Sequence, residues 1–263
     1  MNTDDSSNSR SLAAERRMLI CKMAQERGSV NVTELAQAFE AGISTIRRDL
    51  DALHEEGKLV RVHGGAILKE TATPRTPYKQ SRSQHIEEKS AIAEAALEYM
   101  PESGTVFMGG GTTTYQLALK IQSRMETCVV TNALDLAAHL VSNNLADVDL
   151  VGGTVRKDSL QTNCEESLEN LYWDVTFMSP AAIDIRRGIT TDNRNTARQE
   201  QLILKHGAKF VALCDSSKIN HFAYAQVAPI SKIDVLITDS GADPEFIEQM
   251  KDVGVEVVVV SVL

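Results

Sequence analysis

Cysteine is scarce in this sequence, and its few cysteines are scattered. The chain of 263 residues contains four, namely Cys21, Cys128, Cys164 and Cys214, and no two of them form a Cys-x-x-Cys pair. Single, widely separated cysteines support neither a disulfide framework nor a zinc site, so we expect no bound metal. They are typical of proteins that stay in a reducing compartment.

Long apolar runs are also lacking. No stretch approaches the roughly 18 consecutive apolar residues of a membrane-spanning helix, and the polar N-terminus has no signal-peptide core. The sequence therefore predicts a cytoplasmic protein without a membrane anchor. Its apolar content of 43% is nevertheless ordinary for a globular protein with a packed core.

The sequence also has no excess of positive charge, because its formal net charge is −9. Residues 1–69 contain ten Lys/Arg and ten Asp/Glu, whereas residues 70–263 contain seventeen and twenty-six, so the second part holds the whole net charge. An acidic body is unsuited to nonspecific binding of nucleic acid. The neutral first part can still bind DNA if its cations share one face.

The chain divides at a segment with few apolar residues and two Thr-Pro pairs. This segment, residues 69–84, predicts a partly extended interdomain linker, and the polar residues 1–10 predict a disordered tail. We therefore expect one domain over residues 11–68 and a second over residues 85–263.

The first domain has the pattern of three helices followed by a hairpin. Helices are expected from about residue 11 to 27, from about residue 33, and from about residue 43 to 56. The third helix gathers its apolar residues on one face, namely Ile43, Ile46, Leu50 and Leu53. Two short alternating runs around Gly64-Gly65 predict a β-hairpin. This order indicates a winged helix-turn-helix, with the helix-turn-helix at about residues 30–49; the alternative is a small three-helix bundle without a nucleic-acid role.

Two adjacent arginines, Arg47 and Arg48, lie in the first turns of the third helix. Cations are unfavourable near a helix N-terminus by roughly 0.3–1 kcal/mol each. Two interpretations are open: the arginines bind an anionic partner such as DNA, or they belong to a solvated charged face. On the first interpretation an arginine can bind guanine O6 and N7 together, and the hairpin cations would contact phosphates or a minor groove. The expected DNA-binding residues are Ser44, Thr45, Arg47, Arg48, Lys58, Arg61 and His63. His63 has an equally good interpretation as a structural residue, and Asp49 is expected to position an arginine or a helix.

From Gly104 onward, short apolar strands alternate with amphipathic helices. This pattern predicts a C-terminal α/β domain with a mostly parallel sheet that helices cover on both faces. Ligands bind at the carboxyl ends of the strands in such sheets. Four of these ends carry glycines, hydroxyls, an amide or charged groups, which suit a polyhydroxylated phosphate; chance turn chemistry is the alternative. The expected effector-binding residues are Gly110, Gly111, Thr112, Thr113, Thr131, Asn132, Gly153, Arg156, Asp215, Ser217 and Lys218.

Residues 29–66 resemble the DNA-binding domain of the DeoR family of bacterial regulators. The resemblance rests on Glu34-Leu35-Ala36, on Thr45 to Leu50 (TIRRDL), on Gly57 and Leu59, and on Arg61 to Ala66 (RVHGGA). One departure is the pair Ala41-Gly42, where the family usually has Val-Ser before the recognition helix. The usual serine cap is thus lost, and Ser44 is a candidate to replace it.

Residues 85–262 resemble the effector domain of the same family, which is similar in fold to sugar-phosphate isomerases and senses phosphorylated sugars. The matching positions are Gly111-Thr112-Thr113, Thr131-Asn132, Gly152-Gly153, Asp174, Phe177, Asp215 to Lys218 and Ile237-Thr238-Asp239. The departures are Gly109 or Gly110 in place of an aspartate, Ser179–Ala182 in a usually Gly-rich segment, and Glu200 near a commonly seen lysine. They indicate an unusual ligand or a partly degenerate pocket.

The resemblance implies a DNA-binding repressor of a carbohydrate-metabolism operon that a phosphorylated sugar releases from its operator. It implies no cofactor and no catalytic residue. A single winged helix reads only a few base pairs, so we expect a dimer or tetramer, and the apolar strand from Val255 onward is expected at a sheet edge where it could pair with a second copy. Two alternatives stay open: an isomerase-like enzyme with a DNA-binding appendage, using Asp215 and Lys218, and a regulator with a non-functional pocket. The enzyme is disfavoured because the Gly109–Thr114 loop supplies no second acidic group.

Overall fold

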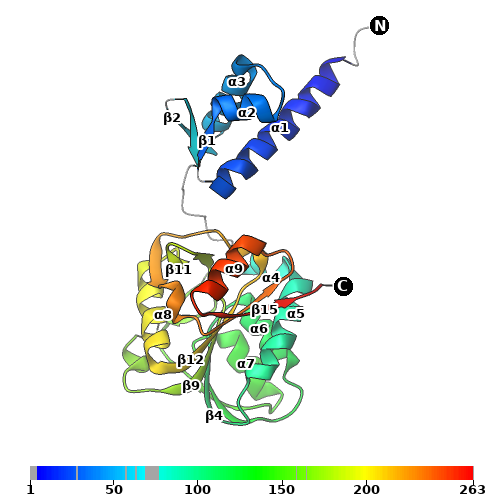
Figure 1. The fold of residues 1–263 in the computed structure, drawn as a ribbon. Coiled ribbons are helices and arrows are strands. Elements are labelled where there is room, and N and C mark those ends of the chain that lie inside the picture. Colours follow the sequence, from blue (N-terminus) through cyan, green and yellow to red (C-terminus); the bar gives the residue numbers. More distant parts are fainter. Residues whose placement is uncertain are drawn as a thin grey trace. The chain divides into compact units, whose positions relative to one another are not determined.

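The computed structural model describes residues 5–27, 29–56, 58–62, 64–68, 77–157, 159–163 and 165–262 (Figure 1). The chain divides into two compact units, Met1–Thr71 and Ala72–Leu263, with the boundary inside the predicted linker. Within the described residues, no helix is long and apolar enough to cross a membrane. The same residues contain no group of His, Cys, Asp and Glu side chains that could hold a metal ion.

The first unit contains the predicted three helices and hairpin, together with one strand that the sequence did not reveal. Its elements are α1 (Asp5–Arg27), β1 (Ser29–Asn31), α2 (Val32–Ala38), α3 (Ile43–Glu55), β2 (Leu59–Val62) and β3 (Gly65–Leu68). The three strands form an antiparallel sheet in the order β1-β3-β2, in which Val30 lies opposite Ala66. The wing, defined here as β2 and β3, is therefore anchored to the helices by β1.

The N-terminal tail differs from the prediction. Helix α1 begins at Asp5, so the expected disorder of residues 1–10 is wrong for residues 5–10, while residues 1–4 lie outside the described part of the chain. The expectation rested on polar composition alone. Neither glycine nor proline interrupts residues 5–27, and a helix that has nucleated gains one hydrogen bond for each residue that it adds.

The core of the first unit confirms most of the predicted apolar face of α3. Ile46, Leu50 and Leu53 are buried against Ile20 of α1 and Leu35 of α2. Ile43, the first residue of α3, was also expected on this face but is 49% exposed. The buried face of α3 therefore begins at its second turn.

The second unit is built around a seven-stranded sheet in the order β15-β14-β12-β9-β4-β5-β6, with every neighbouring pair parallel. Its strands are β4 (Ser103–Met108), β5 (Glu126–Thr131), β6 (Asp147–Leu150), β9 (Trp173–Met178), β12 (Gly207–Leu213), β14 (Val235–Asp239) and β15 (Glu256–Val260). The predicted parallel α/β domain is confirmed, and so is the edge position of the last strand.

Helices cover both faces of this sheet. They are α4 (Tyr78–Ser83), α5 (Ile86–Ala96), α6 (Thr112–Lys120), α7 (Leu134–Ser142), α8 (Arg194–His206) and α9 (Pro244–Asp252). Alternate strand residues enter two separate cores. Val211 packs in the core that contains α5, α6 and α7, whereas Phe210 and Ala212 pack in the core that contains α8 and α9. This period of two is what a sheet buried on both faces requires.

Helix α4 corrects the predicted linker, which was expected to reach residue 84. Residues 77–84 belong to the second unit, because Tyr78 is buried and Lys89 of α5 holds the end of α4. The Lys89 Nζ donates hydrogen bonds to the carbonyl oxygens of Ser81 (2.6 Å) and Gln84 (2.7 Å). These contacts come from another helix, so the local composition could not reveal them. Residues 69–76 lie outside the described part of the chain.

Several short elements were not predicted from the sequence. They are two small antiparallel sheets, β7 (Thr154–Val155) with β8 (Thr162–Asn163), and β10 (Ala182–Asp184) with β11 (Gly188–Thr191) and β13 (Ala225–Ala228). The 3-10 turns η1 (Leu97–Tyr99), η2 (Glu166–Leu168), η3 (Ser216–Lys218) and η4 (Ile230–Lys232) complete the unit.

Candidate functional site

The start of α3 lacks a side-chain cap. Gly42 is the N-cap residue, and no side chain caps the helix. The Gly42 carbonyl instead accepts hydrogen bonds from the N–H groups of Thr45 (2.9 Å) and Ile46 (3.1 Å). Ser44 lies inside the first turn, so the proposal that it replaces the cap is wrong.

The outward face of α3 presents the residues that the sequence selected. Ser44, Arg47 and Arg48 are exposed, and Thr45 is partly exposed. Neither arginine forms an ion pair or a hydrogen bond with any described residue. Two guanidinium groups therefore project from the first turns of α3 without a partner among the described side chains.

Asp49 is the one acidic residue of α3 that is buried, and it confirms the expectation that it positions arginines. Its Oδ2 accepts a hydrogen bond from Nε of Arg16 at 2.6 Å, and its Oδ1 accepts one from Nε of Arg17 at 3.0 Å. Both arginines lie on α1. The carboxylate therefore fixes α3 against α1, and hydrogen bonds to charged groups are the stronger kind.

The wing cations are engaged within the unit. Lys58 pairs with Glu56 at 2.7 Å, and this contact raises the pKa of the Lys58 amine. Arg61 donates to Asp51 of α3 at 2.8 Å and to the carbonyl oxygen of Gly65. Arg61 therefore joins α3 to the wing, in addition to any contact with DNA. His63 lies outside the described residues.

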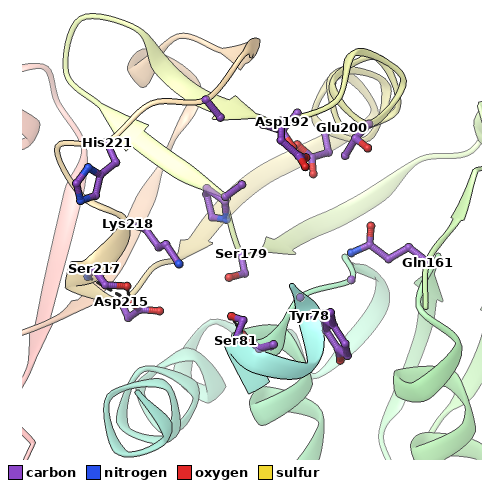
Figure 2. Close-up of a pocket in the computed structure, with 18 residues that line it drawn as sticks. Tyr78, Ser81, Gln161, Ser179, Asp192, Glu200, Asp215, Ser217, Lys218 and His221 are labelled. Carbon is purple, nitrogen blue, oxygen red and sulfur yellow. Dashed lines mark hydrogen bonds between the residues drawn. The ribbon is translucent and has the colours of Figure 1, made fainter. Parts of the chain in front are cut away.

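A pocket opens in the second unit at the carboxyl ends of three neighbouring strands, β12, β9 and β4 (Figure 2). This is the edge of the sheet at which the sequence predicted a ligand. Its walls come from six separate segments. The lining residues are Tyr78, Ser81, Gly110, Gly111, Thr112, Gln161, Ser179, Pro180, Ala181, Thr191, Asp192, Thr196, Glu200, Asp215, Ser217, Lys218, His221 and Ala223.

Six of the eleven predicted effector-binding residues line this pocket, namely Gly110, Gly111, Thr112, Asp215, Ser217 and Lys218. They follow β4 and β12, which flank β9 in the sheet. Four of the other five lie at or after the ends of β5 and β6, which are farther along the sheet, with β6 at its edge. The fifth, Thr113, is the second residue of α6. The strand order, which sequence reasoning did not give, decides which strand ends reach the pocket.

The remaining five residues lie behind the wall or away from it, which corrects the expectation of direct contact. Thr113 accepts a hydrogen bond from Ser179 (3.3 Å), and the buried Thr131 donates one to the carbonyl oxygen of Met108 (2.6 Å). Arg156 donates to the hydroxyl of the lining residue Thr196. Gly153 lies in the exposed turn before β7.

Asn132 supports the pocket from behind. Its Oδ1 accepts a hydrogen bond from the Gly110 N–H at 3.0 Å, and its carbonyl oxygen accepts one from the Thr162 N–H at 2.8 Å. The residue thus ties the turn after β4 to β8. Thr131-Asn132 shapes the pocket without lining it.

One side of the pocket favours negative charge. Helix α6 has Gly111 as its N-cap residue and no side-chain cap, and the N-terminus of an uncapped helix attracts anions. Lys218 lines the same cavity as this turn. Exclusion of water and the neighbouring charge of Lys218 lower the pKa of the His221 imidazole. An anionic group and neutral hydrogen-bonding groups are what this side can bind.

Carboxylates also reach the pocket, although sequence reasoning found only one of them. Asp215 was predicted, and its Oδ1 accepts hydrogen bonds from the N–H (3.2 Å) and the hydroxyl of Ser217. Two further lining carboxylates were missed: Asp192, which follows β11, and Glu200, which lies on α8. Glu200 had been noted only as a departure from a family pattern. The spacing in the sequence gave no signal that these segments meet.

Comparison with known proteins gave matches over nearly the whole chain. The model for the "DeoR-like helix-turn-helix domain" matches residues 16–72, and that for the "DeoR C terminal sensor domain" matches residues 84–240. A putative aga operon transcriptional repressor of Escherichia coli O157:H7 is 30% identical over 99% of each chain. The HTH-type transcriptional regulator GlpR of Haloferax volcanii is 33% identical over 94% of this chain and 98% of its own.

Similarity to solved structures is weaker. Ribose 5-phosphate isomerase A from Neisseria gonorrhoeae matches with a TM-score of 0.37 and 14% identity, over 56% of each chain. A likeness of this size supports no inference about activity.

Proposed function

Because this chain belongs to the DeoR family of transcriptional regulators, we propose that it represses a carbohydrate-metabolism operon and that a phosphorylated sugar releases it from the operator. The observation that carries the proposal is the composition of the pocket. An uncapped helix N-terminus and Lys218 line the same cavity as several hydroxyl, amide and carboxylate groups. Such a cavity suits a ligand with one anionic end and one hydroxylated end.

The proposed DNA contact is made by the outward face of α3. Arg47 and Arg48 project from its first turns, where they can reach base edges in a major groove. In this proposal Lys58 exchanges its ion pair with Glu56 for a contact with the phosphate backbone. Repression, rather than activation, is the role printed in the names of the aga and CsqR relatives from Escherichia coli.

The proposed effector site places the phosphate at the α6 N-terminus and Lys218, with His221 as a further hydrogen-bonding group. The sugar then lies toward Ser179, Gln161 and the carboxylates of α8 and the turn before it. A ligand changes DNA affinity only to the extent that it binds the two conformations unequally. The pocket must therefore contact an element that differs between the DNA-bound and released forms.

Helix α4 is the candidate for that element. It is the first helix after residues 69–76, which follow the DNA-binding unit in the chain, and its Tyr78 and Ser81 line the pocket. The Ser81 hydroxyl is 3.3 Å from the Thr112 hydroxyl at the start of α6. A phosphate at the α6 N-terminus would therefore act directly on a contact of α4.

Thermal denaturation with a panel of sugar phosphates tests the proposal. A pentose 5-phosphate or hexose 6-phosphate is expected to raise the melting temperature, because a ligand at 100 times its Kd stabilises a protein by about 2.7 kcal/mol. The same compound should release a fluorescent operator fragment, selected beforehand from random DNA. The parent sugar without phosphate is the matched ligand control. Stabilisation by no member of the panel would contradict the proposal and favour a non-functional pocket.

An isomerase-like enzyme is the second candidate, because Asp192, Glu200 and Asp215 bring three carboxylates to a cavity that also holds Lys218. We propose a regulator instead, since the family match covers both units and the Asp215 Oδ1 already accepts two hydrogen bonds from Ser217. Incubation of the purified protein with each panel member, followed by chromatography of the products, separates the two. Conversion of any sugar phosphate at an enzymatic rate would favour the enzyme.

A further inference from the structure

Gln161 has a side chain that is enclosed by protein but has no hydrogen-bond partner among the described residues. The residue is 8% exposed and lines the pocket. Its backbone is fixed by a bridge to Ala133 and by a 2.7 Å hydrogen bond from the Arg156 N–H to its carbonyl oxygen. The amide nitrogen and oxygen remain accessible from the cavity. An amide left unpaired at a pocket wall is therefore placed for a ligand.

The direction of the side chain supports this interpretation. Figure 2 shows the Gln161 amide entering the cavity from one side and the Lys218 amine entering from the other. The two groups thus lie at opposite ends of the same space. A ligand whose anionic group lies at Lys218 would extend its other end toward Gln161.

The position of Gln161 depends on Gly110. A Cβ atom added to Gly110 would lie 2.3 Å from both Cγ and Nε2 of Gln161, so the glutamine side chain occupies the space that any other residue at 110 would need. Asn132 holds both partners, through the Gly110 N–H and through Thr162, the neighbour of Gln161. Gly110, Asn132 and Gln161 therefore form one built wall of the pocket.

We propose that Gln161 determines the specificity of the effector site by forming a hydrogen bond with a hydroxyl group on the sugar part of the ligand. A primary amide both donates and accepts, which matches a hydroxyl group better than it matches a phosphate. The inference rests on the proposed function, because it takes the ligand to be a phosphorylated sugar. It adds that the site distinguishes sugar phosphates by a group on the side of the cavity opposite Lys218.

Isothermal titration of the full-length protein tests the inference. The probes are ribose 5-phosphate, fructose 6-phosphate, glucose 6-phosphate, galactose 6-phosphate and inorganic phosphate. For the sugar phosphate that binds most tightly, Gln161→Met is expected to weaken binding about tenfold, the usual effect of one lost hydrogen bond. Binding of inorganic phosphate should weaken less than binding of the sugar phosphate, because Lys218 enters the cavity from the side opposite Gln161. Gln249→Met, at a partly exposed position on α9, is the matched control.

A pair of variants checks the dependence on Gly110. Gly110→Ala should weaken the same sugar phosphate about as much as Gln161→Ala, because its Cβ displaces the amide. In a Gln161→Ala background, Gly110→Ala should have little further effect, which is the non-additivity expected of residues in contact.

The outcomes separate this inference from the function on which it rests. If a sugar phosphate binds wild type and Gln161→Met equally well, the role of Gln161 is refuted and the proposed function stands. Equal weakening of sugar phosphate and inorganic phosphate also refutes it, since that is the mark of general disruption. If no probe sugar phosphate binds wild type, both the inference and the proposed function fail.

Discussion

Arg48 and Asp49 are neighbours in the sequence with opposite environments. Arg48 is exposed, whereas Asp49 is buried in contact with two arginines of α1. A helix turns about 100° per residue, so adjacent residues can serve DNA contact and internal packing separately. Their substitutions should accordingly have different consequences.

Arg48→Ala is expected to weaken operator binding by about 1–3 kcal/mol, or roughly five- to 150-fold, and to relax the base preference at one position. The measurement is fluorescence anisotropy with operator DNA at fixed salt, since salt alone changes such affinities. Arg198→Ala, which removes an exposed arginine of the second unit, is the matched control. An affinity within a factor of two of wild type would show that Arg48 does not contact bases.

Asp49→Asn is expected to lower the free energy of unfolding of the first unit by about 2 kcal/mol, because hydrogen bonds to charged groups are worth roughly 1.5–3 kcal/mol. Urea denaturation measures the change. Asp51→Asn is the control on the same helix, and its exposed ion pair with Arg61 should contribute no more than about 1 kcal/mol. If the two substitutions lowered the free energy of unfolding equally, the burial of Asp49 would contribute nothing to stability.

Residue-level predictions from the sequence succeeded where a local pattern decides the environment. Helical spacing separated the buried Ile46 and Leu50 from the exposed Arg47 and Arg48, because the period of a helix acts within a few residues. Gln161 and Ser81 gave no such signal. Each reaches the pocket through a turn or short helix whose position depends on distant contacts.

At the level of elements, α4 has two roles: it forms part of the pocket wall, and it is the first helix of the second unit. The Tyr78 hydroxyl donates a hydrogen bond to the Asp135 carboxylate at the start of α7, and the Arg82 guanidinium lies 4.2 Å from the centre of the Tyr115 ring of α6. Burial and the contact with Asp135 raise the pKa of the Tyr78 phenol, so it remains a donor at neutral pH. These contacts hold α4 against α6 and α7.

Tyr78→Phe removes the donor while keeping the ring. We expect the sugar phosphate to bind with nearly unchanged affinity, but the concentration that releases half of the operator DNA should rise by about threefold to tenfold. The reason is that a weakened attachment of α4 lowers the coupling free energy between the two sites, which is typically about 1–3 kcal/mol.

The two measurements are titration calorimetry for binding and anisotropy for release. Tyr172→Phe serves as control, because Tyr172 is 72% exposed and lies outside the pocket lining. If Tyr78→Phe weakened sugar-phosphate binding as much as operator release, Tyr78 would be shown to shape the pocket. It would then not be the residue that couples ligand binding to DNA release.

Long periodic elements were predictable from the sequence, and short ones were not. Helix α7 (Leu134–Ser142) is one of the expected amphipathic helices, because its nine residues are enough to show the pattern. Strands such as β8 contain two residues, which is too few for any period to appear. The pocket depends on these short elements and on the order of strands in the sheet, so its composition required the tertiary structure.

On the scale of the whole molecule, the net charge of −9 lies in residues 70–263, while the cations of α3 serve a unit without net charge. Specific binding with one winged helix is weak, so we propose that two copies bind one operator. Strand β15 is the edge of the large sheet within the described residues, and its Val259 is 44% exposed. A second copy of this chain is the partner that such an edge suits.

Val259→Lys is expected to weaken self-association at least tenfold, because lysine on an edge strand opposes pairing with another chain. Operator affinity should fall with it, while binding of the sugar phosphate stays unchanged. Sedimentation equilibrium at micromolar concentration measures association. Val141→Lys, on an exposed position of α7, is the control; unchanged association of the Val259 variant would place the contact elsewhere.

The division of labour along α3 has a practical consequence. Its inward residues, Ile46, Asp49, Leu50 and Leu53, hold the unit together, while the positions 44, 47 and 48 face outward. A combinatorial library at these three positions can therefore be screened against foreign promoters with little danger of unfolded variants. The sensor unit would be untouched by such retargeting, so each selected variant would carry the original metabolite response to a new gene, as a designed biosensor requires.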